Sequence, residues 1–336
     1  MNNVYIIAEA GVNHNGSLDK ALALVDIAFN AGADCIKFQA YTADELVTKN
    51  APKAEYQKGG SEETQYDMLL KYELSFDNFK VISSYCKYRN IDFLVTPFSL
   101  RWVKVFKSME IKGFKISSGS VTSKDLLKEI GMTRLPVILS TGMSNLEDIE
   151  KAVEILRING CKDLSILHCV SLYPTPIEKV NLFSMHVLKE IFKVPVGFSD
   201  HTIGTRVAPL AIAAGATILE KHFTINKTLD GPDHKISLNP HELKIYIKKS
   251  RKACIICGNK EKKILEEEMD IKRMVQGSLV AKKFIKEGQI IFKHMLIEKR
   301  PSTGISPMEA HNIIGKIATR DIKADEILTY EHFMEG

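Results

Sequence analysis

The sequence predicts a (β/α)8 barrel followed by a small β-rich domain, and three observations carry this prediction. Through the first 258 residues, eight strand-like apolar runs alternate with amphipathic helical stretches. Strands that are buried on both faces have near-continuous apolar sequences, as these runs do. Eight β/α units in about 250 residues are typical of a closed barrel. After residue 276 the pattern changes to short strands and turns, which is typical of a compact β module.

The eight strand candidates are spaced so that a helix fits between successive strands. They begin at Val4, Asp34, Ile91, Gly113, Pro136, Leu164, Val194 and Ala216. Amphipathic stretches predict helices over 18–30, 76–89, 145–159 and 182–192, the first opened by Ser17 as an N-cap. A doubly wound sheet is the alternative. It would be expected to carry a G-x-G-x-x-G turn after the first strand, and the sequence has none there.

The chain divides into three segments. Residues 1–258 would form the barrel, 259–276 a charged linker, and 277–336 the small domain. Within the small domain, A-K-K-F-I-K-E-G-Q-I from Ala281 is echoed by A-T-R-D-I-K-A-D-E-I from Ala318, which predicts repeated short strands. Residues 42–75 form a long insertion after the second strand, and such insertions are commonly either functional or disordered.

Composition excludes several classes of function. The chain has 336 residues, of which 45% are hydrophobic, enough for one large core and a small extra domain. Its net charge of +5 is dispersed, which suits anionic ligands but does not indicate a nucleic-acid partner. No apolar run approaches the roughly 20 residues of a membrane span. Six scattered cysteines and the lack of a secretory signal lead us to expect a cytoplasmic protein with reduced thiols.

Two histidines stand at matched positions of the last two strands. The runs V-G-F-S-D-H and I-L-E-K-H place His201 and His222 at the ends of apolar segments one β/α unit apart. Neighbouring parallel strands lie about 5 Å apart, so both imidazoles can reach one ion. A single histidine here would more often be structural. The pair predicts a metal site, and two imidazoles with open positions suit a divalent cation.

Polar residues gather where the other strands end, which is where barrel active sites lie. Lys37 and Lys115 stand within apolar strands, although lysine is rarely buried unpaired. A Gly-Pro turn places Asp233 near the same rim. Some of the hydroxyl groups could equally cap the following helices. The remaining candidates at strand ends are Glu9, Gln39, Thr96, Ser118, Ser140 and Ser199.

These residue types favour one kind of chemistry and leave two alternatives. Lysines beside hydroxyl groups suit a phosphate or a carboxylate, and a cation can polarise a carbonyl. Together they indicate carbon–carbon bond formation between a phosphorylated anionic donor and a carbonyl acceptor. A Schiff-base aldolase with Lys37 or Lys115 as nucleophile is the first alternative. A non-catalytic carbohydrate-binding protein, with the terminal module as binder, is the second.

An ordered set of motifs gives a family resemblance. In chain order they are A-E-A-G-V-N-H-N-G, K-F-Q, V-T-P-F, K-I-S-S-G, S-T-G-M, H-C-V-S-L-Y-P-T-P, F-S-D-H-T, E-K-H-F-T, G-P-D-H and K-R-P. With these motifs the chain resembles the sialic acid synthase family, also called the nonulosonic acid synthases, over essentially its whole length. The last segment resembles the antifreeze-like (SAF) domain of that family.

The resemblance implies a particular reaction. Phosphoenolpyruvate condenses with the open-chain aldehyde of an N-acetylated hexosamine, water enters at C2 of the donor, and phosphate leaves by C–O cleavage. The cation would be Mn²⁺, with Mg²⁺ or Co²⁺ as alternatives, and His201 and His222 would hold it. The acceptor expected first is N-acetylmannosamine. The alternative is a diacetamido-trideoxy hexose, which would make the chain a legionaminic or pseudaminic acid synthase.

The resemblance also assigns roles to single residues. Arg300 would reach the N-acetyl group from the terminal domain of a partner chain, in a domain-swapped homodimer. Ser120 and Ser171 depart from the family pattern, where glutamate and asparagine are frequent, and they put the identity of the sugar in doubt. The catalytic residues would be Glu9, Lys37, Lys115 and Asp233. The substrate-binding residues would be Gln39, Thr96, Ser118, Ser140, Ser171, Tyr173, Ser199 and Arg300.

Overall fold

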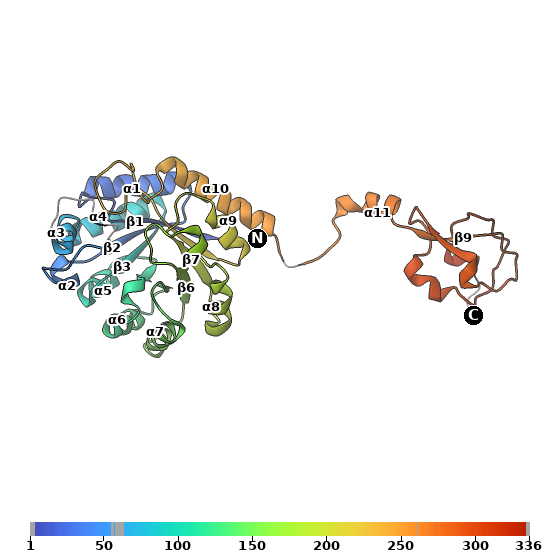
Figure 1. Cartoon of the computed structure of the whole chain (residues 1–336), viewed down its shortest axis with the longest axis horizontal. Coiled ribbons are helices and arrows are strands. Elements are labelled where there is room, and N and C mark those ends of the chain that lie inside the picture. The colour runs from blue at the N-terminus through green and yellow to red at the C-terminus, as the bar shows by residue number, and fades with distance from the viewer. Residues whose placement is uncertain (1–3, 55–56, 58–63, 260, 334–336) are drawn as a thin grey trace. The chain divides into compact units, whose positions relative to one another are not determined.

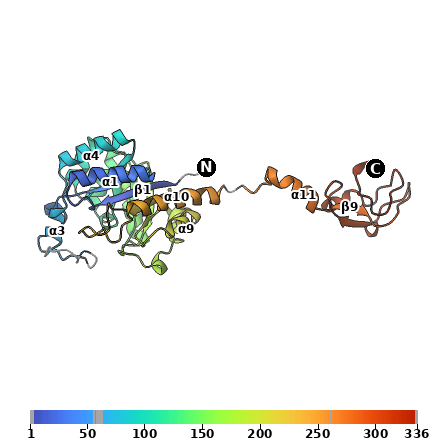
Figure 2. The same cartoon turned by 90° about the horizontal axis from the view of Figure 1, so that it is seen from above.

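The computed structural model describes residues 4–54, 57, 64–259 and 261–333 (Figure 1). The chain separates into two compact units, Met1–Asn259 and Lys260–Gly336. Figure 2 shows the same two units from above. Each unit has a hydrophobic core of its own, so each is described separately.

The first unit is a closed barrel of eight parallel strands, β1 to β8 in sequence order, which confirms the predicted fold (Figure 1). β1 closes the ring by pairing with β8 as well as with β2. In this register Glu9 stands opposite both Lys37 and His222. The strands are Tyr5–Gly11, Cys35–Ala40, Asp92–Pro97, Gly113–Ile116, Val137–Ser140, Leu164–Cys169, Val196–Asp200 and Ile218–His222.

Helices cover the outside of the barrel, and their ends follow ordinary capping chemistry. Ser17 caps α1 by accepting a hydrogen bond from the backbone N–H of Lys20, as the sequence predicts. The barrel helices are α1 Leu18–Ala31, α4 Phe76–Arg89, α5 Leu100–Lys107, α6 Lys124–Thr133, α7 Leu146–Ile158, α8 Ser184–Phe192, α9 Val207–Ala213 and α10 Pro240–Cys257.

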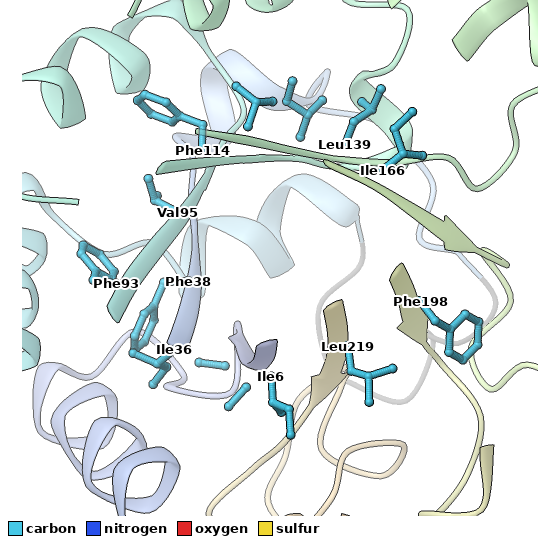
Figure 3. Close-up of a cluster of buried hydrophobic side chains, with 14 of the residues drawn as sticks. Ile6, Ile36, Phe38, Phe93, Val95, Phe114, Leu139, Ile166, Phe198 and Leu219 are labelled. Carbon is cyan, nitrogen blue, oxygen red and sulfur yellow. The ribbon is translucent and has the colours of Figure 1, made fainter. Parts of the chain in front are cut away.

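Strand alternation divides the buried residues of the barrel into two layers. Outward-pointing side chains such as Ile6, Phe38 and Leu219 pack against the surrounding helices (Figure 3). A smaller inner cluster includes Ile7 and Leu167 and fills the barrel. Polar side chains replace this inner layer toward the carboxyl ends of the strands, and this replacement creates the site described below.

The second unit is a small β module whose two halves are related by the predicted echo. β9 (Ser278–Ala281) pairs antiparallel with β10 (Leu296–Lys299). Ile285 and Ile322 hold equivalent places in the echo, and each donates a backbone hydrogen bond to the other, at 2.9 and 2.8 Å. Gly288 and Asp325 are also equivalent, and both have positive φ, 78° and 70°. The repeat is therefore one of structure as well as of sequence.

Two segments have more structure than the sequence predicts. The insertion after β2 contains α2 (Ala43–Leu46) and α3 (Gln65–Lys71). The expected linker contains α11 (Met269–Val275). Among the described residues, no helix is both long and apolar enough to cross a membrane. All six cysteines are free thiols.

Candidate active site

A cavity of about 480 Å³ opens at the carboxyl ends of the barrel strands. Twelve of the fourteen residues predicted for the site line it, although they come from eight separate parts of the chain. Asp233 and Arg300 are the two that do not. The twelve are Glu9, Lys37, Gln39, Thr96, Lys115, Ser118, Ser140, Ser171, Tyr173, Ser199, His201 and His222.

Lys37 lies at the centre of the first cluster in this cavity. Its Nζ is 2.9 Å from Glu9 Oε2 and donates a hydrogen bond of 3.1 Å to Thr96 Oγ1. Gln39 Nε2 donates to the other carboxylate oxygen of Glu9 at 3.1 Å. Lys37 is 3% exposed and Glu9 1%, so neither charge is solvated by bulk water. The charges of Lys37 and Glu9 therefore stabilise each other, and an anion that enters the cavity would be bound by Lys37.

Lys115 forms the second cluster, and Glu220 joins it to the first. Lys115 Nζ donates to Ser140 Oγ at 2.6 Å. The two oxygens of Glu220 each lie 3.8 Å from a lysine Nζ, one from Lys37 and the other from Lys115. Ser199 Oγ also donates to Glu220, at 3.1 Å. Two lysines, two carboxylates and several hydroxyl groups thus share one buried space.

The electrostatics of this cluster are those of a prepared anion site. Burial raises the pKa of Glu220, but Lys115 and Lys37 outweigh it and lower this pKa to about 2. Burial also lowers the pKa of Lys37, and here Glu220 and Glu9 prevail and raise it. Both groups are therefore ionised at neutral pH. Burial raises the pKa of Glu9 above its usual value, and the Glu220 carboxylate adds to this shift.

The two histidines face one another at the edge of the cavity. The centroids of the His201 and His222 rings lie 5.7 Å apart, and the Tyr173 ring lies 4.1 Å from that of His201. His201 Nδ1 is 2.9 Å from the carbonyl oxygen of Val170 and can donate to it, so the neutral ring would carry its free electron pair on Nε2. Burial lowers the pKa of His222, and His201 and Lys37 add to this, so its imidazole is neutral.

This donor set fits a divalent cation with open coordination positions. Among the described residues, nothing hydrogen-bonds His222 Nδ1, although that atom is buried. Within the same residues, no group of three or more His, Cys, Asp or Glu side chains has the arrangement of a metal site. The protein would therefore supply two imidazole ligands, and water or substrate would supply the rest.

Asp233 belongs to the barrel but does not line the cavity. Asp233 Oδ2 is 3.7 Å from His222 Nδ1, so this acid stands directly behind the second histidine. Burial raises the pKa of Asp233 to about 7, and the Glu9 carboxylate adds to the rise. Arg300 belongs to the second unit, where it lines a cavity of about 690 Å³ together with Glu298 and Met308.

The structure places further residues in the cavity that the sequence prediction omits, among them Glu220 and Cys169. Glu220 precedes His222 by two residues and so shares its face of the strand, which is the signal that the sequence carries for it. Cys169 ends β6 with its Sγ 3.8 Å from His201 Nδ1 and 3.6 Å from Ser118 Oγ. Its position at the end of a strand, directly after His168, could have identified it from the sequence as a residue of the site. Ser120 is buried, does not line the cavity, and is 3.0 Å from Ser117 Oγ.

A buried ion pair supports the histidines from the opposite face of their strands. Asp200 and Lys221 are register partners in β7 and β8, and their charged atoms are 3.1 Å apart. Asp200 Oδ1 also accepts hydrogen bonds from the backbone N–H and the hydroxyl of Thr202, at 2.9 and 2.7 Å. Lys221 Nζ donates to the carbonyl oxygen of Thr202. These contacts fix the backbone on both sides of His201.

Comparison with known proteins follows the same division into two units. The sequence model of the NeuB family matches residues 24–262, and that of the SAF domain matches residues 276–334. The N,N'-diacetyllegionaminic acid synthase of Campylobacter jejuni is 44% identical over 332 residues, which cover 98% of this chain and 99% of that protein.

Other relatives are named for the synthesis of related nine-carbon acids. The pseudaminic acid synthase of Campylobacter jejuni is 34% identical, with 98% of this chain and 96% of that protein covered. A solved structure, the N-acetylneuraminic acid synthetase of Leptospira borgpetersenii, is 34% identical with a TM-score of 0.72, and the match covers 80% of this chain and 90% of that one.

Proposed function

Because the chain belongs to the NeuB family, the sialic acid and related nonulosonic acid synthases, we propose that it condenses phosphoenolpyruvate with a diacetamido-trideoxy hexose. The product would be a nine-carbon 2-keto-3-deoxy acid, released with inorganic phosphate. Relatives at 44% and 41% identity are named N,N'-diacetyllegionaminic acid synthases, so we place this acceptor ahead of N-acetylmannosamine, the sugar expected first from the sequence.

The observation that carries the proposal is the buried cluster of two lysines with flanking hydroxyl groups beside a pair of imidazoles. Lys37 and Lys115 would bind the carboxylate and phosphate of the donor, with Thr96, Ser140 and Ser199 as hydrogen-bond donors. Low exposure strengthens each of these interactions. The cation that fits the His201–His222 pair would supply Lewis-acid polarisation of the sugar aldehyde.

The reaction balances with groups in the cavity and one acid behind it. C3 of the donor forms a bond to the aldehyde carbon, the aldehyde oxygen takes up a proton, water adds at donor C2, and the C2–O bond to phosphate breaks. Asp233 lies behind His222 and outside the cavity, and its pKa of about 7 makes it a nearby acid that can resupply the proton taken up at the aldehyde oxygen. Glu9, whose pKa is raised by burial, can accept the proton that the water loses.

The test is phosphate release from phosphoenolpyruvate with a panel of acetamido sugars, followed by mass spectrometry of the product. We expect release with a diacetamido-trideoxy hexose, loss of activity in EDTA, and recovery with Mn²⁺. Replacement of Lys37 by Met should lower kcat/KM by roughly 10³-fold. Replacement of Lys112, an exposed lysine paired with Asp92, should leave kcat/KM unchanged. Release of phosphate without any acceptor, or with none of the sugars, would refute the proposal.

A Schiff-base aldolase is the second candidate, because burial lowers the pKa of Lys115, and the neighbouring Lys37 adds to this. Against it, Lys115 Nζ already donates to Ser140 Oγ and to the carbonyl oxygen of Ile116 at 3.2 Å. Borohydride in the presence of pyruvate separates the two functions. Covalent trapping on Lys115, together with activity that survives EDTA, would favour the aldolase.

A further inference from the structure

The imidazole of His201 is held by the loop that follows β6. His201 Nδ1 lies 2.9 Å from the carbonyl oxygen of Val170, the first residue after that strand. Five residues further along the same loop, the backbone N–H of Thr175 donates a hydrogen bond of 2.9 Å to the carbonyl oxygen of His201. The loop is therefore joined to this histidine twice, once at the ring and once at the backbone.

Thr175 closes this connection from within the loop. Its hydroxyl lies 2.9 Å from the carbonyl oxygen of Leu172 and 3.2 Å from that of Val170, and its single proton serves both. Thr175 is 4% exposed and is not one of the residues that line the cavity. A buried threonine hydroxyl that bonds to its own loop fixes the direction of the carbonyl groups it contacts. The Val170 oxygen is thus held by Thr175 on one side and contacts the His201 ring on the other.

The position of this carbonyl oxygen decides which nitrogen of His201 can bind a cation. A carbonyl oxygen only accepts hydrogen bonds, so it favours the tautomer that has its proton on Nδ1 and its free electron pair on Nε2. The thiol of Cys169 lies 3.8 Å from the same Nδ1 and can donate to it in the other tautomer. The first tautomer prevails as long as the Val170 oxygen stays at its distance of 2.9 Å.

We propose that Thr175 is a positioning residue for the cation site: by fixing the carbonyl oxygen of Val170, it selects the tautomer in which His201 Nε2 binds the cation. Groups that hold the second nitrogen of a metal-ligating histidine contribute strongly to metal affinity. The role differs from that of the Asp200–Lys221 pair, which holds the strand backbone. The inference rests on the proposed function only in that both place a cation at the His201–His222 pair.

The experiment measures Mn²⁺ binding to the full-length protein without substrate, by electron paramagnetic resonance of the free ion. Thr175→Val keeps the size and branching of the side chain and removes the hydroxyl. It should weaken Mn²⁺ binding by roughly 10- to 100-fold, which is the usual cost of losing the outer partner of a ligating histidine. Thr175→Ala, a second variant without the hydroxyl, should show a loss of the same order. Thr175→Ser keeps the hydroxyl and should bind within about threefold of the wild type.

The matched control is Thr217→Val. The Thr217 hydroxyl also donates to a backbone carbonyl oxygen, that of Val196 at 3.0 Å. Val196 begins β7, at the end of the barrel opposite the cavity, so this variant should bind Mn²⁺ as the wild type does. Circular dichroism establishes that each variant is folded before the titration.

Wild-type affinity in both Thr175→Val and Thr175→Ala would overturn the inference. An equal loss in Thr175→Ser would also overturn it, because the hydroxyl would then not be the cause. A wild type that binds no Mn²⁺ would overturn it whatever the phosphate assay shows. If the wild type binds Mn²⁺ but releases phosphate with none of the sugars, the proposed function fails, and the inference is decided by the Thr175 variants alone.

Discussion

Glu220 joins the two halves of the anion site, because its carboxylate contacts Lys37 and Lys115 from opposite sides. Without substrate, Glu9 and Glu220 balance the charges of the two lysines. An incoming phosphoenolpyruvate must therefore compete with these carboxylates for the lysines. The cluster keeps Lys37 ionised and both lysines ordered in a space that excludes bulk water, which is the arrangement that makes electrostatic stabilisation effective.

Replacement of His222 by Ala should lower kcat/KM by roughly 10³-fold or more, because one of two protein ligands to the cation is lost. The barrel should remain folded by circular dichroism. Mn²⁺ titration followed by electron paramagnetic resonance checks whether the loss lies in metal binding. His241→Ala is the control, since His241 is an exposed histidine of α10. Near-wild-type activity of the His222 variant would refute the metal assignment.

Replacement of Lys221 by Met should destabilise the barrel by about 3–5 kcal/mol, because Asp200 would be left buried without its partner. Asp200→Asn added to Lys221→Met should recover part of this loss. Urea unfolding followed by the fluorescence of Trp102, the chain's single tryptophan, reports on the barrel alone. Lys151→Met is the control, since the Lys151–Glu147 pair is exposed. Equal stability of the Lys221 variant and the control would show that the buried pair contributes little.

The barrel should lose stability as the pH falls from about 6.5 toward 4, because His14 is buried as the neutral form. Burial lowers its pKa from 6.5 to about 4. Below pH 6.5 the unfolded chain binds a proton that the folded chain does not, so stability present above this pH is lost as the pH falls. His14 alone contributes about 2 kcal/mol to this loss at pH 5. Urea unfolding in EDTA at pH 7.5 and pH 5 measures it.

His14→Asn is the informative variant, because its side-chain oxygen can accept the hydrogen bond that Gly16 N–H donates to His14 Nδ1 at 3.1 Å. The difference between the two pH values should shrink by about 2 kcal/mol in this variant. His241→Asn should keep the wild-type difference. If the His14 variant also keeps it, other groups account for the acid sensitivity.

At the scale of single elements, sequence reasoning succeeded where a pattern is long and local. The bounds predicted for α4 are those of the structure, and its N-cap, Ser75, and C-terminal Asn90 are both visible in the sequence. It failed for α2 and α3, which have four and seven residues. Helices this short have little stability of their own, and here they are held by the cluster around Tyr41 and Leu69, which no local pattern reveals.

Replacement of Asn239 by Ala should destabilise the barrel by about 1 kcal/mol, because Asn239 caps α10. Its side-chain oxygen accepts from Glu242 N–H, and Glu242 accepts in return from Asn239 N–H, each at 2.9 Å. Asn239→Ser should retain most of the stability, since serine also caps. The Trp102 unfolding midpoint distinguishes the two variants. Equal loss in both would show that the cap hydrogen bond is not the cause.

At the scale of the whole molecule, the site exists only because the barrel closes. Glu9 of the first strand and His222 of the last are register partners, 213 positions apart in sequence. The order of strands and the rule that active sites lie at their carboxyl ends sufficed to predict ten of the twelve lining residues, and the family resemblance added Ser171 and Tyr173. Which carboxylate pairs with which lysine could not be predicted. The pairing depends on the directions in which these side chains point, and their charged atoms lie less than 4 Å apart.

Arg300 provides a test of the expected swapped dimer. Arg300→Ala should raise the KM for the acceptor and leave the KM for phosphoenolpyruvate unchanged. When the Arg300→Ala and His222→Ala variants are mixed and their dimers reassembled, the mixture should have about a quarter of wild-type activity. Half of the dimers then contain one chain of each variant, and each such dimer holds one intact site out of two. Sizing chromatography should show a dimer throughout. No regained activity on mixing would place Arg300 in the site of its own chain or outside any site.

The strand alternation that separates His201 and His222 from Asp200 and Lys221 makes β7 and β8 intolerant of any change in length. Insertion or deletion of one residue would turn an imidazole outward and bring a buried charge into its place.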